Sequence, residues 1–188
     1  DNLKNLYKYE KGFDPGKNRL DDEMKEYMTK TLGIKSDIDL RSSTECFGMK
    51  GSPMGDAATW FHISSSAYGG MGSTSGKAAF KEVFKVFLDE KNYPIDFHCI
   101  AGQDRTGAVA FIINALLGVP LEDLYLDWEV TGFWNRDVNF NHEKRFNHLV
   151  KVFDALPGVN MTEKVENYVL GLGFTKDDIA KLRAIMLE

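Results

Sequence analysis

Apolar side chains recur at helix and strand spacings in the first part of the chain. Residues 20–32 carry them at every third or fourth position, which predicts a helix. Residues 34–40 and 60–63 are short apolar patterns that predict two strands. The segments 42–59 and 64–76 are rich in small and polar residues, so we expect loops there.

Helix and strand patterns continue to alternate in the middle of the chain. An apolar stripe after Gly76 predicts a helix, and residues 95–99 predict a buried strand. Residues 105–117 are apolar around most of a helix, so this helix should lie in the centre of the protein. Thr175 and Asp178 form a candidate capping box for the last helix. Four helical patterns close the chain, over residues 121–131, 141–155, 162–172 and 176–187.

Strands that alternate with helices, followed by a helical tail, predict an α/β fold. We expect a small central, mostly parallel sheet flanked by helices. The chain has 188 residues, of which 43% are hydrophobic, enough for one core in a single domain over residues 1–188. Ligands in such folds gather at the carboxyl ends of strands, and Cys99 lies at one such end.

The net charge and the hydropathy of the chain argue against two classes of partner, nucleic acid and the membrane interior. The formal net charge is −5, whereas proteins that bind nucleic acid usually carry a basic stripe, so we expect no nucleic-acid partner. No apolar run approaches the ~20 residues of a membrane helix, so we expect no integral membrane segment. The chain begins at Asp1 rather than Met, so we expect that an N-terminal segment was trimmed. Its location stays open: secreted or periplasmic if a signal was removed, cytoplasmic otherwise.

One segment, His98 to Gly107, combines a strand end, a thiol, an arginine and a helix start. Such a loop offers backbone N–H donors to an anion, and the helix dipole adds positive potential. Gly102 and Gly107 would let the backbone turn and approach the anion, and the fork of Arg105 matches two phosphate oxygens. We expect the following residues to contact phosphate: Ile100, Ala101, Gly102, Gln103, Asp104, Arg105 and Thr106.

The same positive field should act on the thiol of Cys99. A free thiol has a pKa of about 8.5, and a helix N-terminus beside an arginine lowers it. The resulting thiolate would attack phosphorus and form a phosphocysteine intermediate. Thr106 would hydrogen-bond to the sulfur, and His98 and Gly107 would support the loop. Asp104 would protonate the leaving oxygen and later accept a proton from water.

Two segments resemble the protein tyrosine phosphatase superfamily of Cys-x5-Arg enzymes. The loop at 98–107 is similar to that of a bacterial branch with the pattern His-Cys-x-Ala-Gly-Lys-Asp-Arg-Thr-Gly. Residues 33–42, with Glu45, are similar to the family's Gly-Ile-x-x-x-Ile-Asp-Leu-Arg stretch, so the resemblance covers most of residues 20–188. It implies a tyrosine-phosphatase-like fold and hydrolysis of phosphate monoesters with no metal or cofactor. In that branch the loop aspartate is the proposed general acid, which agrees with Asp104.

The chain departs from this branch in two places. Gln103 stands where lysine is usual, and the Asn-x-Arg-Asp segment that usually opens the family has no match. Losing the lysine should weaken binding of highly anionic head groups. We therefore expect proteins that carry phosphotyrosine as the main substrates. Proteins that carry phosphoserine or phosphothreonine, and small phosphomonoesters, are further expected substrates. The alternatives are a phosphoinositide or inositol-phosphate phosphatase, a non-catalytic phosphate-binding module and a rhodanese-like sulfur carrier.

Several polar residues near these motifs have open roles. Arg41 would contact the substrate or pair with Glu45, and Asp39 would hold the loop. Cys46 would belong to the core, or form a redox bridge with Cys99. Alternative general acids are Asp56, Asp127 and Glu129.

Two other patterns imitate known motifs incompletely. Residues 69–78 lack the first glycine and the hydroxyl of a nucleotide P-loop, so we interpret them as a loop before a helix. His142, Glu143 and His148 lack the spacing of a zinc-binding helix, so we interpret them as part of a surface helix.

Overall fold

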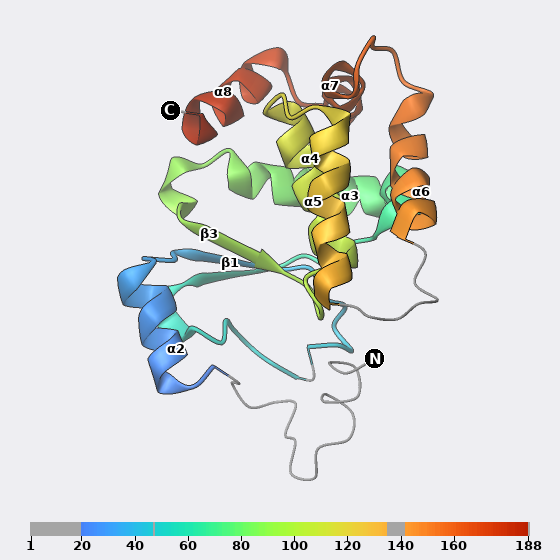
Figure 1. Cartoon of the computed structure of the whole chain (residues 1–188). Helices are drawn as coiled ribbons and strands as arrows, with labels where there is room; N and C mark the ends of the chain where they lie inside the picture. Colours follow the sequence, from blue (N-terminus) through green and yellow to red (C-terminus); the bar gives the residue numbers. More distant parts are fainter. Residues whose placement is uncertain (1–19, 47, 135–141, 188) are drawn as a thin grey trace.

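The computed structural model of this chain describes residues 20–46, 48–134 and 142–187. Its sheet consists of three parallel strands in the order β2–β1–β3, which confirms the predicted α/β fold (Figure 1). The strands are β1 (Ser36–Asp39), β2 (Thr59–His62) and β3 (Ile95–His98).

The strand register brings the polar ends of all three strands together. Asp39 at the end of β1 lies opposite His62 of β2 and His98 of β3. Because the strands are parallel, all three end at the same edge of the sheet. The chain leaves β3 at His98 and enters the Cys99 loop at this edge.

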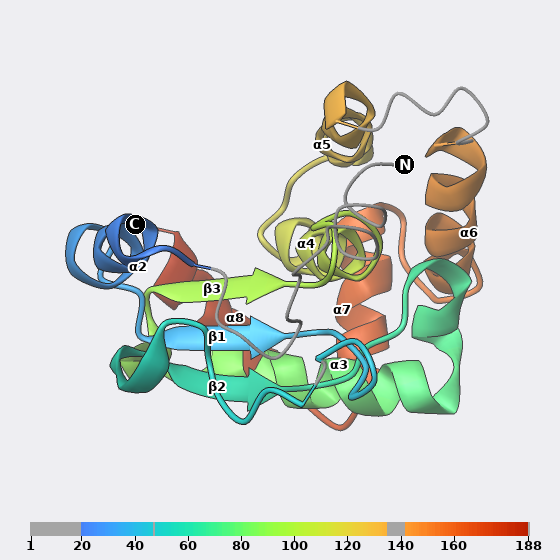
Figure 2. The same cartoon turned by 90° about the horizontal axis from the view of Figure 1, so that it is seen from below.

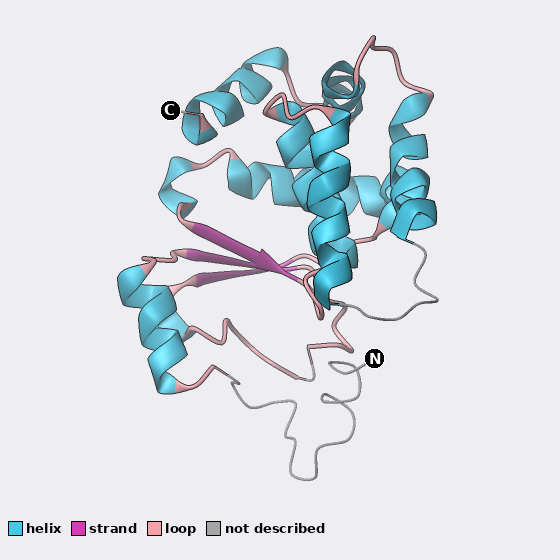
Figure 3. Cartoon of the chain, in the orientation of Figure 1, coloured by secondary structure: helices cyan, strands magenta, loops and turns pink. Residues whose placement is uncertain are grey.

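Most of the helices pack on one face of the sheet, and the strands lie in front of them in the view from below (Figures 2 and 3). The first described helix begins as α2 (Asp22–Glu26) and continues as the π-helical turn η1 (Tyr27–Thr31). It lies on one side of the sheet, whereas α3 (Thr74–Phe87) and α4 (Asp104–Leu116) lie on the other. The tail consists of α5 (Leu121–Trp134), α6 (His142–Asp154), α7 (Met161–Gly171) and α8 (Lys176–Met186). Three short 3-10 turns are η2 (Gly55–Ala57), η3 (Tyr68–Gly72) and η4 (Glu90–Asn92).

The central strand β1 is buried on both faces. Ile38 is fully buried and belongs to the same apolar cluster as Phe80 and Phe84 of α3. Asp37 and Asp39 alternate with Ile38 along the strand and are also buried. A buried carboxylate must be paired, so this polar face of the sheet requires cations nearby.

Helix α4 is as central as its sequence predicts. Seven of its residues are buried, and they are distributed around the helix rather than along one stripe. Thr175 and Asp178 form the predicted capping box at the start of α8. No helix among the described residues is long and apolar enough to cross a membrane.

The glycine-rich run at 69–78 forms the turn η3 and the first turns of α3. Ser73 caps α3 by accepting a hydrogen bond from the backbone N–H of Gly76. A Cβ on Gly76 would lie 2.1 Å from the carbonyl oxygen of Gly70, so only glycine fits there. This glycine therefore allows η3 and α3 to approach each other closely.

Candidate active site

Cys99 lies between β3 and α4, at the carboxyl edge of the sheet. Its side chain is buried, and both Cys99 and Cys46 are free thiols. Gly102 has a φ of 67°, in the left-handed region that glycine adopts without strain, as the predicted turn requires. The loop then enters α4 at Asp104, so Cys99 faces the start of a buried helix.

The surroundings of Cys99 favour its thiolate. Burial raises the pKa of the thiol. The Thr106 hydroxyl, the backbone N–H groups of Thr106 and Ala101 and the Arg105 guanidinium oppose this effect, and the resulting pKa is about 7. The buried Thr106 hydroxyl has no hydrogen-bond partner among the described residues, so no other group competes with the sulfur for it.

Arg105 is held by a carboxylate from the loop after β1. Its Nη1 and Nη2 atoms donate to the two carboxylate oxygens of Glu45 at 2.5 and 2.9 Å, and Nη1 also approaches the Leu40 carbonyl oxygen at 3.4 Å. These bonds occupy the end of the guanidinium fork. The edge formed by Nε and the second hydrogen of Nη2 has no partner among the described residues. Arg105 therefore keeps a second pair of N–H donors that can bind an oxyanion in a bidentate manner.

Glu45 is a member of this site whose contact with Arg105 the sequence did not reveal. Hydrogen bonds from Arg105 lower the pKa of Glu45 to about 2 despite its partial burial. The Ser42 backbone N–H and hydroxyl donate to the same carboxylate, at 2.7 and 2.8 Å. This carboxylate is therefore charged at neutral pH and fixes the orientation of Arg105.

Arg41 pairs with Asp39 rather than with Glu45. Its guanidinium donates to both carboxylate oxygens of Asp39, at 2.8 and 2.6 Å. Burial raises the pKa of Asp39, but the bonds from Arg41 and the charge of His98 lower it to about 2. Cys46 is buried beside Asp39, and burial raises its pKa to about 11. In contrast to Cys99, Cys46 is held as a neutral thiol.

His98 connects the loop to the polar face of the sheet. Its Nδ1 lies 3.1 Å from the Cys99 carbonyl oxygen, and its Nε2 lies 3.1 Å from the Asp37 carboxylate. Burial lowers the pKa of His98, but contacts with Asp37, the Cys99 carbonyl and Asp39 raise it to about 9. The imidazole is therefore a cation at neutral pH, and it supplies the charge that Asp37 needs.

The same side chains could in principle hold a metal ion. Asp37, Asp96 and His98 bring their ligand atoms within 4.8 Å of one another. Only neutral imidazole binds a metal, so an ion here would have to displace a proton from His98, whose pKa the contact with Asp37 helps to raise to about 9. We therefore interpret this group as an ion pair with a neighbouring carboxyl group, whose pKa burial raises.

Asp104 lies at the first position of α4 and is bonded to residues from two other elements. The Tyr68 hydroxyl from η3 donates to its Oδ1. The Nη1 atom of Arg145 from α6 lies 2.9 Å from the Tyr68 hydroxyl and 3.3 Å from Asp104 Oδ1. The sequence did not reveal Tyr68 or Arg145 as members of this site. No local signal marks them, because they lie 36 and 41 residues from Asp104 in the chain.

Gly107 does not have the role in the turn that its sequence suggests, and Gln103 has a buried side chain. Gly107 lies inside α4 and does not have the positive φ of a turn. A Cβ on Gly107 would lie 3.0 Å from the Trp128 ring, so its role is close packing against α5. Gln103 is buried, and its side-chain amide nitrogen has no partner among the described residues.

The alternative acids lie on exposed positions. Asp56 is exposed on η2, and Asp127 and Glu129 are exposed on α5. Glu129 accepts a hydrogen bond from the neighbouring Tyr125 hydroxyl at 2.7 Å. No contact of these three carboxylates with the Cys99 loop is found among the described residues, whereas Asp104 belongs to that loop.

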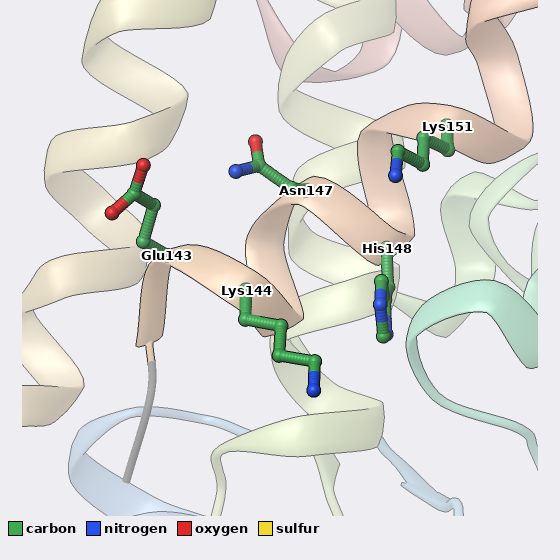
Figure 4. A pocket seen from close by; sticks show the side chains of 5 residues that line it. All are labelled: Glu143, Lys144, Asn147, His148 and Lys151. Carbon is green, nitrogen blue, oxygen red and sulfur yellow. The ribbon is translucent and has the colours of Figure 1, made fainter.

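A shallow pocket of 370 Å³ lies along α6, lined by Glu143, Lys144, Asn147, His148 and Lys151. Figure 4 shows Lys144 and His148 pointing to one side of the helix and Glu143 and Asn147 to the other. These side chains are exposed and of mixed charge, as on a solvated helix surface. We assign no ligand to this pocket.

Comparison with known proteins agrees with this geometry. Residues 16–188 match the model of the tyrosine phosphatase family. A tyrosine-protein phosphatase from Nostoc commune is 29% identical over 69 residues, which cover 37% of this chain and 24% of that relative. The aligned part thus spans about a quarter of the relative. Because the family match extends from before α2 to the end of the chain and includes the Cys99 loop, the chain belongs to the tyrosine phosphatase family.

Proposed function

We propose that this chain hydrolyses phosphate monoesters through a phosphocysteine intermediate on Cys99, with phosphotyrosine in proteins as the main substrate. The observation that carries the proposal is the position of the buried Cys99 thiol before the start of α4, where the Thr106 hydroxyl, backbone N–H groups and Arg105 lower its pKa to about 7. At neutral pH a large fraction of such a thiol is ionised, and the thiolate is the nucleophilic form.

The loop would bind the phosphoryl group beside this sulfur. Backbone N–H groups at the start of α4 and the positive end of the helix dipole favour an anion there. The Nε and Nη2 edge of Arg105 would donate to two phosphate oxygens while Glu45 holds the other edge. Ile100, Ala101, Gly102, Gln103 and Thr106 complete the proposed phosphate loop.

The reaction would proceed in two displacements. In the first, the Cys99 sulfur attacks phosphorus, the bond from phosphorus to the leaving oxygen breaks, and Asp104 gives its proton to that oxygen. In the second, water attacks the phosphocysteine, Asp104 takes a proton from the water, and the sulfur leaves as a thiolate. Inorganic phosphate is the product, and no metal ion is needed for either displacement.

Gln103 favours a singly phosphorylated substrate over a multiply phosphorylated head group. The side chain is neutral, and it replaces a cation that the related bacterial branch carries in this loop. A phosphotyrosine side chain brings one phosphate group, whereas inositol phosphates can bring several and gain more from an additional cation. Phosphoinositide hydrolysis is therefore the second candidate, and Arg41 would contact either substrate only after leaving Asp39.

The test is phosphate release from a phosphotyrosine peptide and from an aryl phosphate, with and without a chelator. We expect turnover that survives the chelator and that Cys99→Ser lowers by at least about 1,000-fold, because serine lacks a comparable anion at neutral pH. Cys46→Ser is the matched control, since Cys46 is the neutral buried thiol. Loss of turnover on chelation, or retained turnover in Cys99→Ser, would contradict the proposal.

A further inference from the structure

Asp104 is held by two side chains from other elements. Tyr68 and Arg145 both contact Oδ1 of its carboxylate, whereas no described residue forms a hydrogen bond with Oδ2. The three residues come from η3, α4 and α6, so three separate elements converge on one oxygen atom. About 40% of the Asp104 side chain remains exposed, so the carboxyl group is not enclosed by its two partners.

The backbone of Tyr68 is in a conformation that tyrosine rarely adopts. Its φ is 52°, and it is the one non-glycine residue with positive φ among the described residues. A left-handed conformation costs free energy for any residue with a Cβ, and such residues concentrate at functional sites. Here the conformation is accompanied by a hydrogen bond from the Tyr68 hydroxyl to Asp104.

Aromatic packing holds the Tyr68 ring in place. Its edge lies against the Trp128 ring, with centroids 5.7 Å apart. On the helix α4, Gly107 leaves the space that Trp128 occupies. The guanidinium of Arg145 lies over the Tyr68 ring, 5.4 Å from its centroid. Tyr68 is therefore fixed between α5 and α6, with its hydroxyl aimed at the loop.

Arg145 acts on the same oxygen and on the tyrosine together. Its Nη1 lies within hydrogen-bonding distance of both the Tyr68 hydroxyl and Asp104 Oδ1. Such donors bind a carboxylate more strongly than a neutral carboxylic acid. The bonds from the Tyr68 hydroxyl and from Arg145 to Oδ1 would therefore strengthen as Asp104 loses its proton. This strengthening favours proton transfer to the leaving oxygen.

We propose that Tyr68 and Arg145 are positioning residues for the general acid, holding Oδ1 of Asp104 so that Oδ2 carries the transferred proton. This inference rests on the proposed function, because it assigns a role within that reaction. In the first displacement the O–H bond at Oδ2 breaks and the proton goes to the leaving oxygen. In the second, Oδ2 takes a proton from the attacking water. Oδ1 keeps both donors throughout.

The experiment compares Tyr68→Phe and Arg145→Gln with the unchanged chain on two substrates. Phenyl phosphate has a poor leaving group that needs a proton, whereas p-nitrophenyl phosphate has a good one that needs it less. We expect each variant to lower kcat for phenyl phosphate about tenfold, and for p-nitrophenyl phosphate less than about twofold. In an Asp104→Asn background neither variant should lower kcat further, because the acid they position is gone.

A matched control removes a different tyrosine hydroxyl. Tyr125 donates to Glu129 on the exposed side of α5, so Tyr125→Phe loses a tyrosine–carboxylate bond and should leave both rates unchanged. Tyr68→Phe keeps the ring that packs on Trp128. Arg145→Gln changes a partly exposed side chain and provides a second folded variant.

Equal slowing of both substrates, or a further loss in the Asp104→Asn background, would overturn the inference. So would a leaving-group-dependent loss in Tyr125→Phe but not in Tyr68→Phe, which would point to Glu129 as the acid. The proposed function is tested separately, because its failure would appear as turnover that does not depend on Cys99.

Discussion

Burial raises the pKa of Cys99, and among the groups that lower this pKa the Thr106 hydroxyl has the largest effect. No hydrogen bond to another group competes for this hydroxyl, because its oxygen has no hydrogen-bond partner among the described residues. Arg105 adds only a weaker charge effect. A neutral side chain therefore helps the nearby cation to favour the thiolate.

This arrangement predicts how the reactivity of Cys99 depends on pH. Thr106→Val removes the hydroxyl, so the pKa of Cys99 should rise from about 7 toward the ordinary value for a thiol. Alkylation by iodoacetamide should then require higher pH, and at pH 6.5 it should slow by about three- to tenfold. Thr106→Ser keeps the hydroxyl and should retain the profile of the unchanged chain. Identical alkylation profiles for the valine and serine variants would contradict this role.

At the scale of elements, local patterns predicted the helices and strands, but contacts between distant elements completed the site. Alternation and helical spacing placed β1, β3 and α4 because each pattern lies within one segment. The Glu45–Arg105 pair joins residues 60 positions apart, and the Tyr68–Asp104 bond joins residues 36 apart. Neither has a signature in local sequence, because each depends on how the loops after β1 and β2 fold toward α4.

Gly107 shows the same limit for a residue that was identified from the sequence. Its place in the Arg-Thr-Gly ending suggested a role in the turn, yet it lies within α4. The ring that needs its missing side chain belongs to Trp128, 21 positions later. A single sequence shows that a glycine is present. It does not show which neighbouring side chain occupies the space where a Cβ would lie.

The ion pair between Asp37 of β1 and His98 of β3 predicts that the free energy of unfolding depends on pH. The pKa of His98 is about 9 in the folded protein, above its ordinary value of about 6.5. The ion pair with Asp37 therefore contributes fully below pH 6.5, and this contribution is lost as pH rises through 9. We expect Asp37→Asn to lower the free energy of unfolding by roughly 1–3 kcal/mol at pH 6, and by less at pH 10.

Urea unfolding at the two pH values measures this difference. Ser52→Ala is the matched control, because the Ser52 hydroxyl donates to the other oxygen of Asp37 at 2.6 Å and carries no charge. Its effect on stability should be similar at pH 6 and pH 10. A constant gap between Asp37→Asn and the unchanged chain across this range would show that the pair is not the source.

At the scale of the whole molecule, one apolar cluster connects the sheet to the helical tail. It extends from Ile38 of β1 through α3 and α4 to Leu182 of α8. On α6, the cluster includes Phe146 and Leu149, and Arg145 lies directly beside them. The position of Arg145 at Asp104 therefore depends on how firmly α6 is anchored in the shared core.

Truncating the α6 anchor tests whether the described elements unfold as one unit. Leu149 is fully buried, so Leu149→Ala should lower the free energy of unfolding by about 2–5 kcal/mol. Because the cluster is continuous, the loss should appear as an earlier single transition in urea, with fluorescence and circular dichroism changing together. Asn147→Ala, on the exposed side of the same helix, should change stability by no more than about 0.5 kcal/mol. A separate early transition in Leu149→Ala would instead mean that the helical tail unfolds apart from the sheet, in which case Arg145 could leave Asp104 while the Cys99 loop stays folded.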